Sequence, residues 1–118
     1  MKYLLFCCTE ENKLNTMSGS EMDAIMDETL VYIEELRKSG RYLASERLQP
    51  VEMATMVRVR NGKLSTTDGP FAETKEQLGG FWLIDARDLD EAIQIAAKFP
   101  SARIGGIEVR PVAEAARG

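Results

Sequence analysis

The chain has 118 residues, of which 44% are hydrophobic and 29% charged, the size and composition of one globular domain that buries its own core. Its 15 basic and 19 acidic residues give a net charge of −4, without the basic tract that nucleic-acid binding requires. The apolar run near the N-terminus, Tyr3–Cys8, is too short for a membrane span or a signal-peptide core. We therefore expect a single cytoplasmic domain, residues 1–118, with no nucleic-acid or membrane partner.

The first predicted strand, Lys2–Cys8, is apolar on both faces, which is typical of the middle of a sheet. Cys7 and Cys8 would point to opposite sides of that strand, so we expect two reduced, buried thiols rather than a disulfide. The polar segment that follows, Thr9–Met17, is predicted to be a loop.

A long helix is predicted to begin at Ser18, which forms a capping box with Glu21, or at the second choice of cap, Ser20 with Asp23. It is predicted to end at Gly40. Its apolar residues recur at helical spacing, and we expect them to form the buried stripe: Met22, Ile25, Met26, Leu30, Ile33 and Leu36. A second strand, Arg41–Leu48, is predicted after it.

The clearest local signal is a β-hairpin in which two alternating segments flank Asn61-Gly62, a favoured two-residue turn. Another apolar strand, Gly79–Ala86, precedes a second helix that Asp88 and Glu91 are predicted to cap as a box. Pro100 ends that helix, whose predicted buried stripe is Leu89, Ala92, Ile93 and Ala96. The last strand has Ile107 and Val109 on one face and Glu108 and Arg110 on the other.

This order of elements predicts an α+β fold, a ferredoxin-like sandwich with a β-hairpin inserted in the middle. Both helices are expected on one face of an antiparallel sheet, so the other face is left open. Because an uncovered apolar face is usually a partner surface, we expect a symmetric homodimer with the two sheets face to face.

The segment after the hairpin, TTDGPFAETKEQLGGFW, contains the candidate site residue Asp68. Two interpretations remain open. In one, Asp68 and Gly69 shape a turn and the pair Gly79-Gly80 lets the chain re-enter the sheet closely. In the other, Asp68 faces a pocket as a hydrogen-bond acceptor or general base. Glu73 and Lys75 are either part of a solvated face or line the same pocket.

Several segments carry a resemblance to a known family: TDGPFAETKEQLGGF, EVRPV, MKYLLF, MVRVRNGK and LDEAIQIAAKFP. Together they resemble the DGPF subgroup of the YCII-related family, within the dimeric α/β-barrel superfamily. The resemblance implies a ferredoxin-like homodimer with a pocket where strand ends meet the DGPF loop. It also implies a link to extracytoplasmic-function sigma factors, beside which members often occur.

Some relatives are thought to use a His–Asp pair, and one branch includes a dehydrochlorinase that acts on a chlorinated aromatic diol or triol. The present chain contains no histidine, although the resemblance leads one to expect a histidine near Ile33. The His–Asp mechanism therefore fails at its first residue. Asp68 matches the acid of the family motif, and Glu108 and Arg110 match residues of its terminal strand.

The other candidate ligand-binding residues have structural alternatives. Arg110 could clamp a carboxylate or form a salt bridge with a neighbouring acid such as Glu108. Tyr3 and Trp82 fit the core or a dimer interface better than a stacking platform. No dinucleotide, phosphate-loop, zinc-protease or nucleophile-elbow motif is present, so the sequence predicts no cofactor and no metal.

Three functions remain open: a small-molecule-binding or regulatory module linked to sigma factors, a cofactor-free enzyme, or a dimer that works through its surface. The enzyme would be of the lyase or isomerase type, with Asp68 as base and Arg110 holding an anionic or phenolic substrate. We favour the binding module, with a small acidic or phenolic ligand, because the chain lacks histidine, the usual general base near pH 7.

Overall fold

A computed structural model describes residues 1–69 and 77–113 of the chain. The elements are β1 (Lys2–Thr9), α1 (Glu11–Thr16), α2 (Gly19–Lys38), β2 (Tyr42–Arg47), the 3-10 helix η1 (Val51–Met53), β3 (Thr55–Arg60), β4 (Lys63–Asp68), β5 (Gln77–Asp85), α3 (Leu89–Ala97), α4 (Ser101–Ile104) and β6 (Gly106–Pro111). The predicted α+β class is confirmed.

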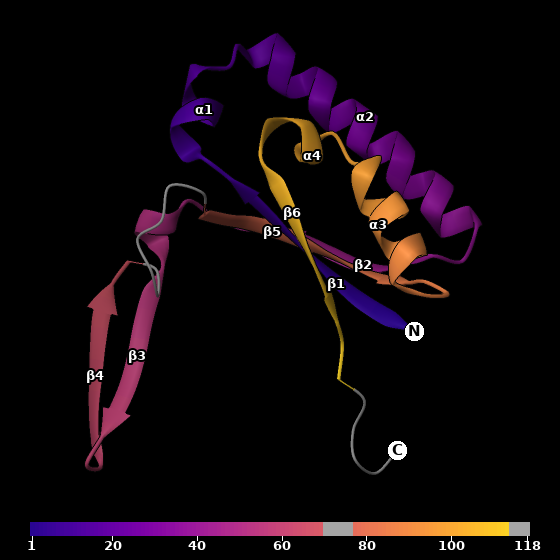
Figure 1. Cartoon of the computed structure of the whole chain (residues 1–118). Helices are drawn as coiled ribbons and strands as arrows, with labels where there is room; N and C mark the ends of the chain where they lie inside the picture. Colours follow the sequence, from indigo (N-terminus) through magenta and orange to yellow (C-terminus); the bar gives the residue numbers. More distant parts are fainter. Residues whose placement is uncertain (70–76, 114–118) are drawn as a thin grey trace.

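The main sheet has four strands in the order β2-β5-β1-β6, and every neighbouring pair is antiparallel. With the inserted hairpin set aside, this is the strand order of a ferredoxin-like fold, with β1 and β5 in the centre. Helices α2 and α3 lie on the same face of the sheet (Figure 1). The central place of β1 explains why its sequence is apolar on both sides.

The core lies between the sheet and the two long helices. Leu5, Ile84 and Phe99 are fully buried there, and the ring of Phe99 stacks on Trp82 with centroids 3.9 Å apart. Each such side chain contributes about 1.5–3 kcal/mol by leaving water. Tyr3 belongs to the same cluster, so the prediction that Tyr3 and Trp82 lie in the core is confirmed.

The predicted caps of α2 are confirmed. The Ser18 hydroxyl accepts a hydrogen bond from the Glu21 N–H, and the Glu21 carboxylate accepts one from the Ser18 N–H. At the other end, Gly40 has a φ of 76°, which favours glycine, and the Arg41 N–H reaches back to the Leu36 carbonyl at 2.8 Å.

The box predicted for α3 is only half formed. Asp88 accepts a hydrogen bond from the Glu91 N–H at 2.9 Å, as predicted. The Glu91 carboxylate accepts instead from the Arg87 N–H at 2.9 Å, one residue before the cap. Glu91 leans this way because it also forms an ion pair with Arg41 at 3.1 Å.

Both predicted stripes are wrong in part. Leu30 of α2 is 59% exposed, and Tyr32 packs against the core in its place. In α3, Leu89 and Ile93 are exposed, whereas Ile95 is buried beside Ala92 and Ala96. In α2, Tyr32 is held toward the core by Phe99, against which it packs edge-on at 4.8 Å. In α3, the buried residues Ala92, Ile95 and Ala96 belong to the same core cluster.

Three segment boundaries also differ from the prediction. The predicted loop Thr9–Met17 contains the short helix α1, and α4 was not predicted. Strand β5 begins at Gln77, two residues earlier than predicted, because Leu78 already pairs with Cys8 of β1.

The two cysteines are free thiols, as predicted. Cys7 and Cys8 are only partly buried, so the prediction that they are buried is wrong.

The predicted hairpin is confirmed, with Asn61 and Gly62 at φ values of 53° and 75° in its turn. Strands β3 and β4 form a sheet of their own, which we call the arm, residues Thr55–Asp68. The arm projects from one end of the main sheet, on the side away from the helices (Figure 1). The radius of gyration is consequently 16.4 Å, whereas a compact chain of this length has about 13.5 Å.

Candidate functional site

The sheet face away from the helices is the first candidate site, and we call it the open face. Leu4 and Phe6 alternate with buried residues along β1. They lie opposite Leu83 and Phe81 of the neighbouring strand β5. All four side chains are partly buried rather than buried, because no described helix covers them. They form an apolar floor two strands wide.

Charged side chains border this floor along β6. Arg110 lies opposite Leu4 and Glu108 opposite Phe6, so both side chains share the open face. Their ion pair confirms the predicted salt bridge between neighbours on the strand. The Arg110 guanidinium also lies 5.2 Å from the centre of the Phe6 ring, a cation–π distance.

Asp68 lies elsewhere, at the root of the arm. It is the last residue of β4, is exposed, and pairs with Thr55. The next residue, Gly69, has a φ of 104° and donates a backbone hydrogen bond to the Ala54 carbonyl at 2.8 Å. The structural interpretation of the Asp68-Gly69 turn is therefore supported for the glycine, while the Asp68 carboxylate remains available to solvent.

Within one chain, the structure does not bring the predicted site residues together. The arm is inserted between β2 and β5, whereas Arg110 lies on β6, at the opposite edge of the sheet. Tyr3 is 2% exposed and faces the helices, on the other side of the sheet from Arg110. Glu73 and Lys75 lie outside the described residues.

An apolar pocket of about 320 Å³ lies at the root of the arm, where the end of β2, η1 and the start of β5 meet. Leu48, Met53 and Leu78 line it, and so does Ala54, whose carbonyl holds Gly69. Asp68 is linked to this pocket through the hairpin, because its strand partner Thr55 directly follows Ala54. The resemblance stated above predicts a pocket at such a place, where strand ends meet the loop.

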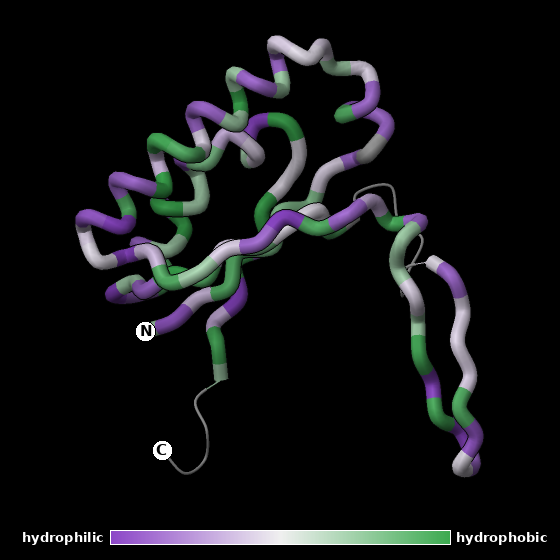
Figure 2. Tube along the Cα trace, turned by 180° about the vertical axis from the view of Figure 1, so that it is seen from behind, coloured by the Kyte–Doolittle hydropathy of each residue, from purple (hydrophilic) through white to green (hydrophobic). Residues whose placement is uncertain are grey.

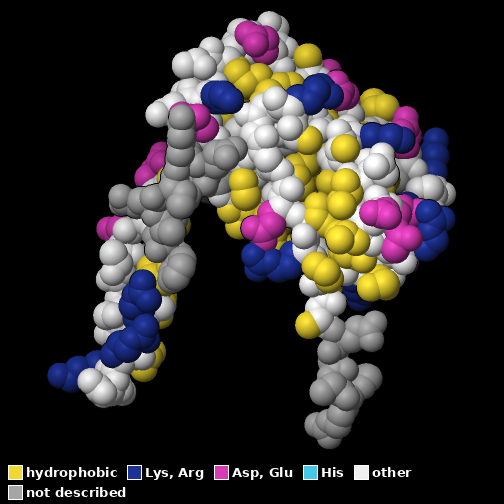
Figure 3. Space-filling view, viewed as in Figure 1, with side chains coloured by type: hydrophobic (Ala, Val, Ile, Leu, Met, Phe, Trp, Pro, Cys, Tyr) yellow, Lys and Arg dark blue, Asp and Glu magenta, His cyan; other side chains and the backbone are white. Residues whose placement is uncertain are grey.

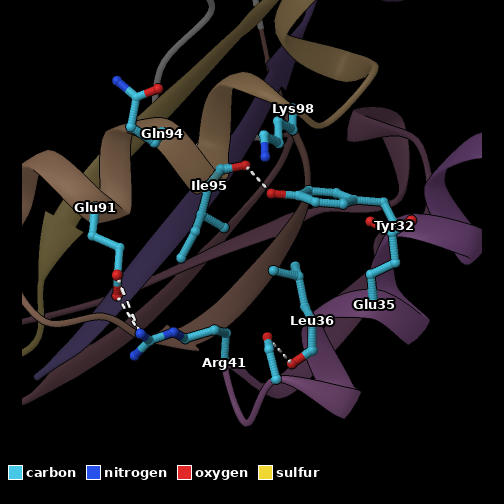
Figure 4. A pocket seen from close by; sticks show the side chains of 9 residues that line it. Tyr32, Glu35, Leu36, Arg41, Glu91, Gln94, Ile95 and Lys98 are labelled. Atoms are coloured by element: carbon cyan, nitrogen blue, oxygen red, sulfur yellow. Dashed lines mark hydrogen bonds and ion pairs between the residues drawn. The ribbon is translucent and has the colours of Figure 1, made fainter.

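A cleft of about 370 Å³ between α2 and α3 was not predicted from the sequence (Figure 4). The Tyr32 hydroxyl donates to the Ile95 carbonyl at 2.8 Å, and the Arg41–Glu91 ion pair closes one end. Burial, and secondarily the charge of Glu35, raises the pKa of Tyr32 to about 12. A tyrosine held neutral in this way bridges two helices rather than transferring protons near neutral pH.

The cleft could not have been found by motif, because its residues come from α2, the start of β2 and α3 and meet only after folding. Among residues 1–69 and 77–113, no three Cys, Asp or Glu side chains lie where they could hold a metal ion. The described helices include none that is long and apolar enough to cross a membrane.

Comparison with known proteins places the chain in a family. The model of the YCII-related domain matches residues 1–116. An uncharacterised protein of Rhizobium meliloti (strain 1021), R00369, is 36% identical over 115 residues, which cover 96% of this chain and 93% of that protein. The chain therefore belongs to the YCII-related family, and its place in the DGPF subgroup stays a prediction.

Proposed function

We propose that this YCII-related protein is a homodimeric small-molecule-binding module, with its ligand chamber between the open faces of two copies. The observation that carries the proposal is the open face itself, an apolar floor bordered by the Glu108–Arg110 pair. Ligand sites are typically apolar and contain a few polar groups that orient the ligand. A cationic side chain beside an aromatic ring suits a small aromatic acid or phenol.

The uncovered apolar floor supports the dimer. Leu4, Phe6, Phe81 and Leu83 are only partly buried within one chain. Two sheets packed face to face would cover all four side chains.

A titration with 4-hydroxybenzoate, which is both an acid and a phenol, tests the binding function. We expect saturable NMR shifts at the amides of Leu4, Phe6 and Leu83. Arg110→Gln should weaken binding by about fivefold or more, because a charge-assisted hydrogen bond is lost. The matched control is Arg103→Gln, which removes an equally exposed arginine paired with Glu28 on the helix side. Shifts confined to other regions, or an equal effect of the two variants, would contradict the proposal.

A second candidate function is a cofactor-free enzyme of the lyase or isomerase type. Because Asp68 and Arg110 lie apart within one chain, Asp68 of one copy would be the base and Arg110 of the second copy the anchor. The observation that favours it is the exposed Asp68, whose strand partner Thr55 directly follows Ala54 of the apolar pocket at the arm root. We would follow exchange of the C3 protons of 4-hydroxyphenylpyruvate in D2O by NMR. This function requires faster exchange with the parent protein than with Asp68→Asn, and equal rates would exclude that role for Asp68.

The family resemblance also implies a regulatory link to an extracytoplasmic-function sigma factor. Co-sedimentation of the purified protein with an extracytoplasmic-function sigma factor would test this link. A complex of defined stoichiometry is the expected result, and independent sedimentation of the two proteins would contradict it.

A further inference from the structure

The arm has two chemically different faces. Residues that pair across the hairpin share a face, so Val57, Val59 and Leu64 lie on one side. They are 56%, 58% and 69% exposed. The other side carries Arg58, Arg60 and Lys63 together with Ser65. Figure 2 shows the alternation along β3, and Figure 3 shows Lys and Arg gathered along the arm with hydrophobic side chains beside them.

This arrangement is unfavourable for an isolated chain. A two-stranded hairpin is at best marginally stable in water unless its apolar face packs against something. No helix or strand among the described residues covers Val57, Val59 or Leu64. Yet the alternation and the turn are those of a well-specified hairpin, which indicates that the apolar face has a partner.

The position of the arm indicates where that partner lies. The arm descends on the open-face side of the sheet, where a second copy docked face to face would sit (Figure 1). Charge also favours a second copy. Three cations and one carboxylate give the arm a net charge of +2, so the rest of the chain carries −6 to make the total of −4. A positive arm is thus attracted to the negative body of another copy.

We propose that each arm packs its apolar face against the partner copy, so that the two arms hold the dimer together and flank the chamber between the sheets. This inference rests on the proposed dimer. It adds that the arm, and not the sheet face alone, determines dimer affinity. It also implies that Asp68 turns toward the partner copy, because Asp68 lies on the same arm face as Val57.

Two variants test the two faces of the arm separately. Val59→Asp places a carboxylate on the apolar face, and Ser65→Asp adds the same charge to the basic face of the same hairpin. Sedimentation equilibrium would give the dimer dissociation constant of each protein. We expect Val59→Asp to raise the constant by at least about tenfold, as for a buried apolar contact, and Ser65→Asp to change it by less than about threefold. Far-UV circular dichroism should show both variants folded, because the arm lies outside the core.

The outcomes distinguish this inference from the proposed function. If the parent is a dimer and Val59→Asp dimerises as tightly as Ser65→Asp, the arm contact is refuted while the open-face dimer stands. If the parent is a monomer, both the arm contact and the proposed open-face dimer are refuted.

Hydrogen exchange provides a second readout that needs no variant. Amides of residues 55–68 should be protected in the dimer and exchange rapidly after dilution to monomer, and equal exchange in both states would overturn the inference.

Discussion

Gly80→Ala should destabilise the fold, because a backbone oxygen occupies the space that a methyl group would need. A Cβ at Gly80 would lie 2.9 Å from the Glu46 carbonyl oxygen and 3.4 Å from the Arg47 Cα. The adjacent Gly79 is a matched control, because its Cβ would meet the Cys7 carbonyl oxygen at an ordinary 3.9 Å. The difference arises because Gly80 approaches the backbone of β2, where it pairs with Arg47, whereas Gly79 approaches β1 at an ordinary distance.

The contact at Gly80 can be relieved only by moving β2 away from β5, since the clashing Glu46 oxygen belongs to the backbone. Overpacking of this kind costs about 1–3 kcal/mol. We expect a loss in that range for Gly80→Ala, and a change within about 0.5 kcal/mol for Gly79→Ala. Urea unfolding followed by far-UV circular dichroism, at one protein concentration for all variants, would measure both.

Equal stabilities of the two alanine variants would refute this reasoning, because they would show that the strands at the root of the arm adjust without cost. A loss at Gly79 larger than that at Gly80 would mean that the β2–β5 register differs from the structure.

Three other perturbations have expected outcomes. Tyr32→Phe removes the hydrogen bond to Ile95 and should cost about 1 kcal/mol in urea unfolding; an unchanged midpoint would show that water replaces it fully. The pKa of Tyr32 is raised to about 12 from its ordinary value of 10.0, so its contribution is complete below pH 10 and is lost as pH rises to about 12. The parent should therefore lose more stability than Tyr32→Phe across that interval, and parallel curves would contradict the raised pKa. Ser18→Ala breaks the capping box and should cost about 1 kcal/mol, whereas Ser20→Ala, which leaves the Glu21 contacts intact, should cost less.

Local signals in the sequence predicted the structure correctly wherever two to five neighbouring residues determine it. The Asn61-Gly62 turn, the Ser18 cap and the Gly40 helix end depend on hydrogen bonds and φ angles of adjacent residues, and all three were predicted correctly. The sheet order followed from the sequence of elements, because ferredoxin-like connections leave few alternatives.

The errors concern contacts between distant segments. Leu30 and Ile93 have suitable helical spacing, but both are exposed. The buried face of a helix depends on contacts with distant residues, such as the one between Tyr32 of α2 and Phe99. Glu91 departs from the predicted box because Arg41, fifty residues away, competes for its carboxylate. The cleft between α2 and α3 was missed for the same reason.

For the candidate site, the sequence predicted Glu108 and Arg110 on one strand face and an uncovered sheet surface. Alternation along the strand is sufficient for the first prediction. The second follows from the placement of both helices on one face of the sheet. The separation of Asp68 from Arg110 was not foreseen, because it depends on the arm turning away from the sheet.

The mass of the chain in solution tests the central claim most directly. Sedimentation equilibrium at micromolar concentration should give twice the 13.2 kDa chain mass, and Leu83→Asp should shift the equilibrium toward monomer because it places a charge on the open face. A parent protein of 13.2 kDa throughout the concentration range would contradict the face-to-face dimer and, with it, the chamber between the two sheets.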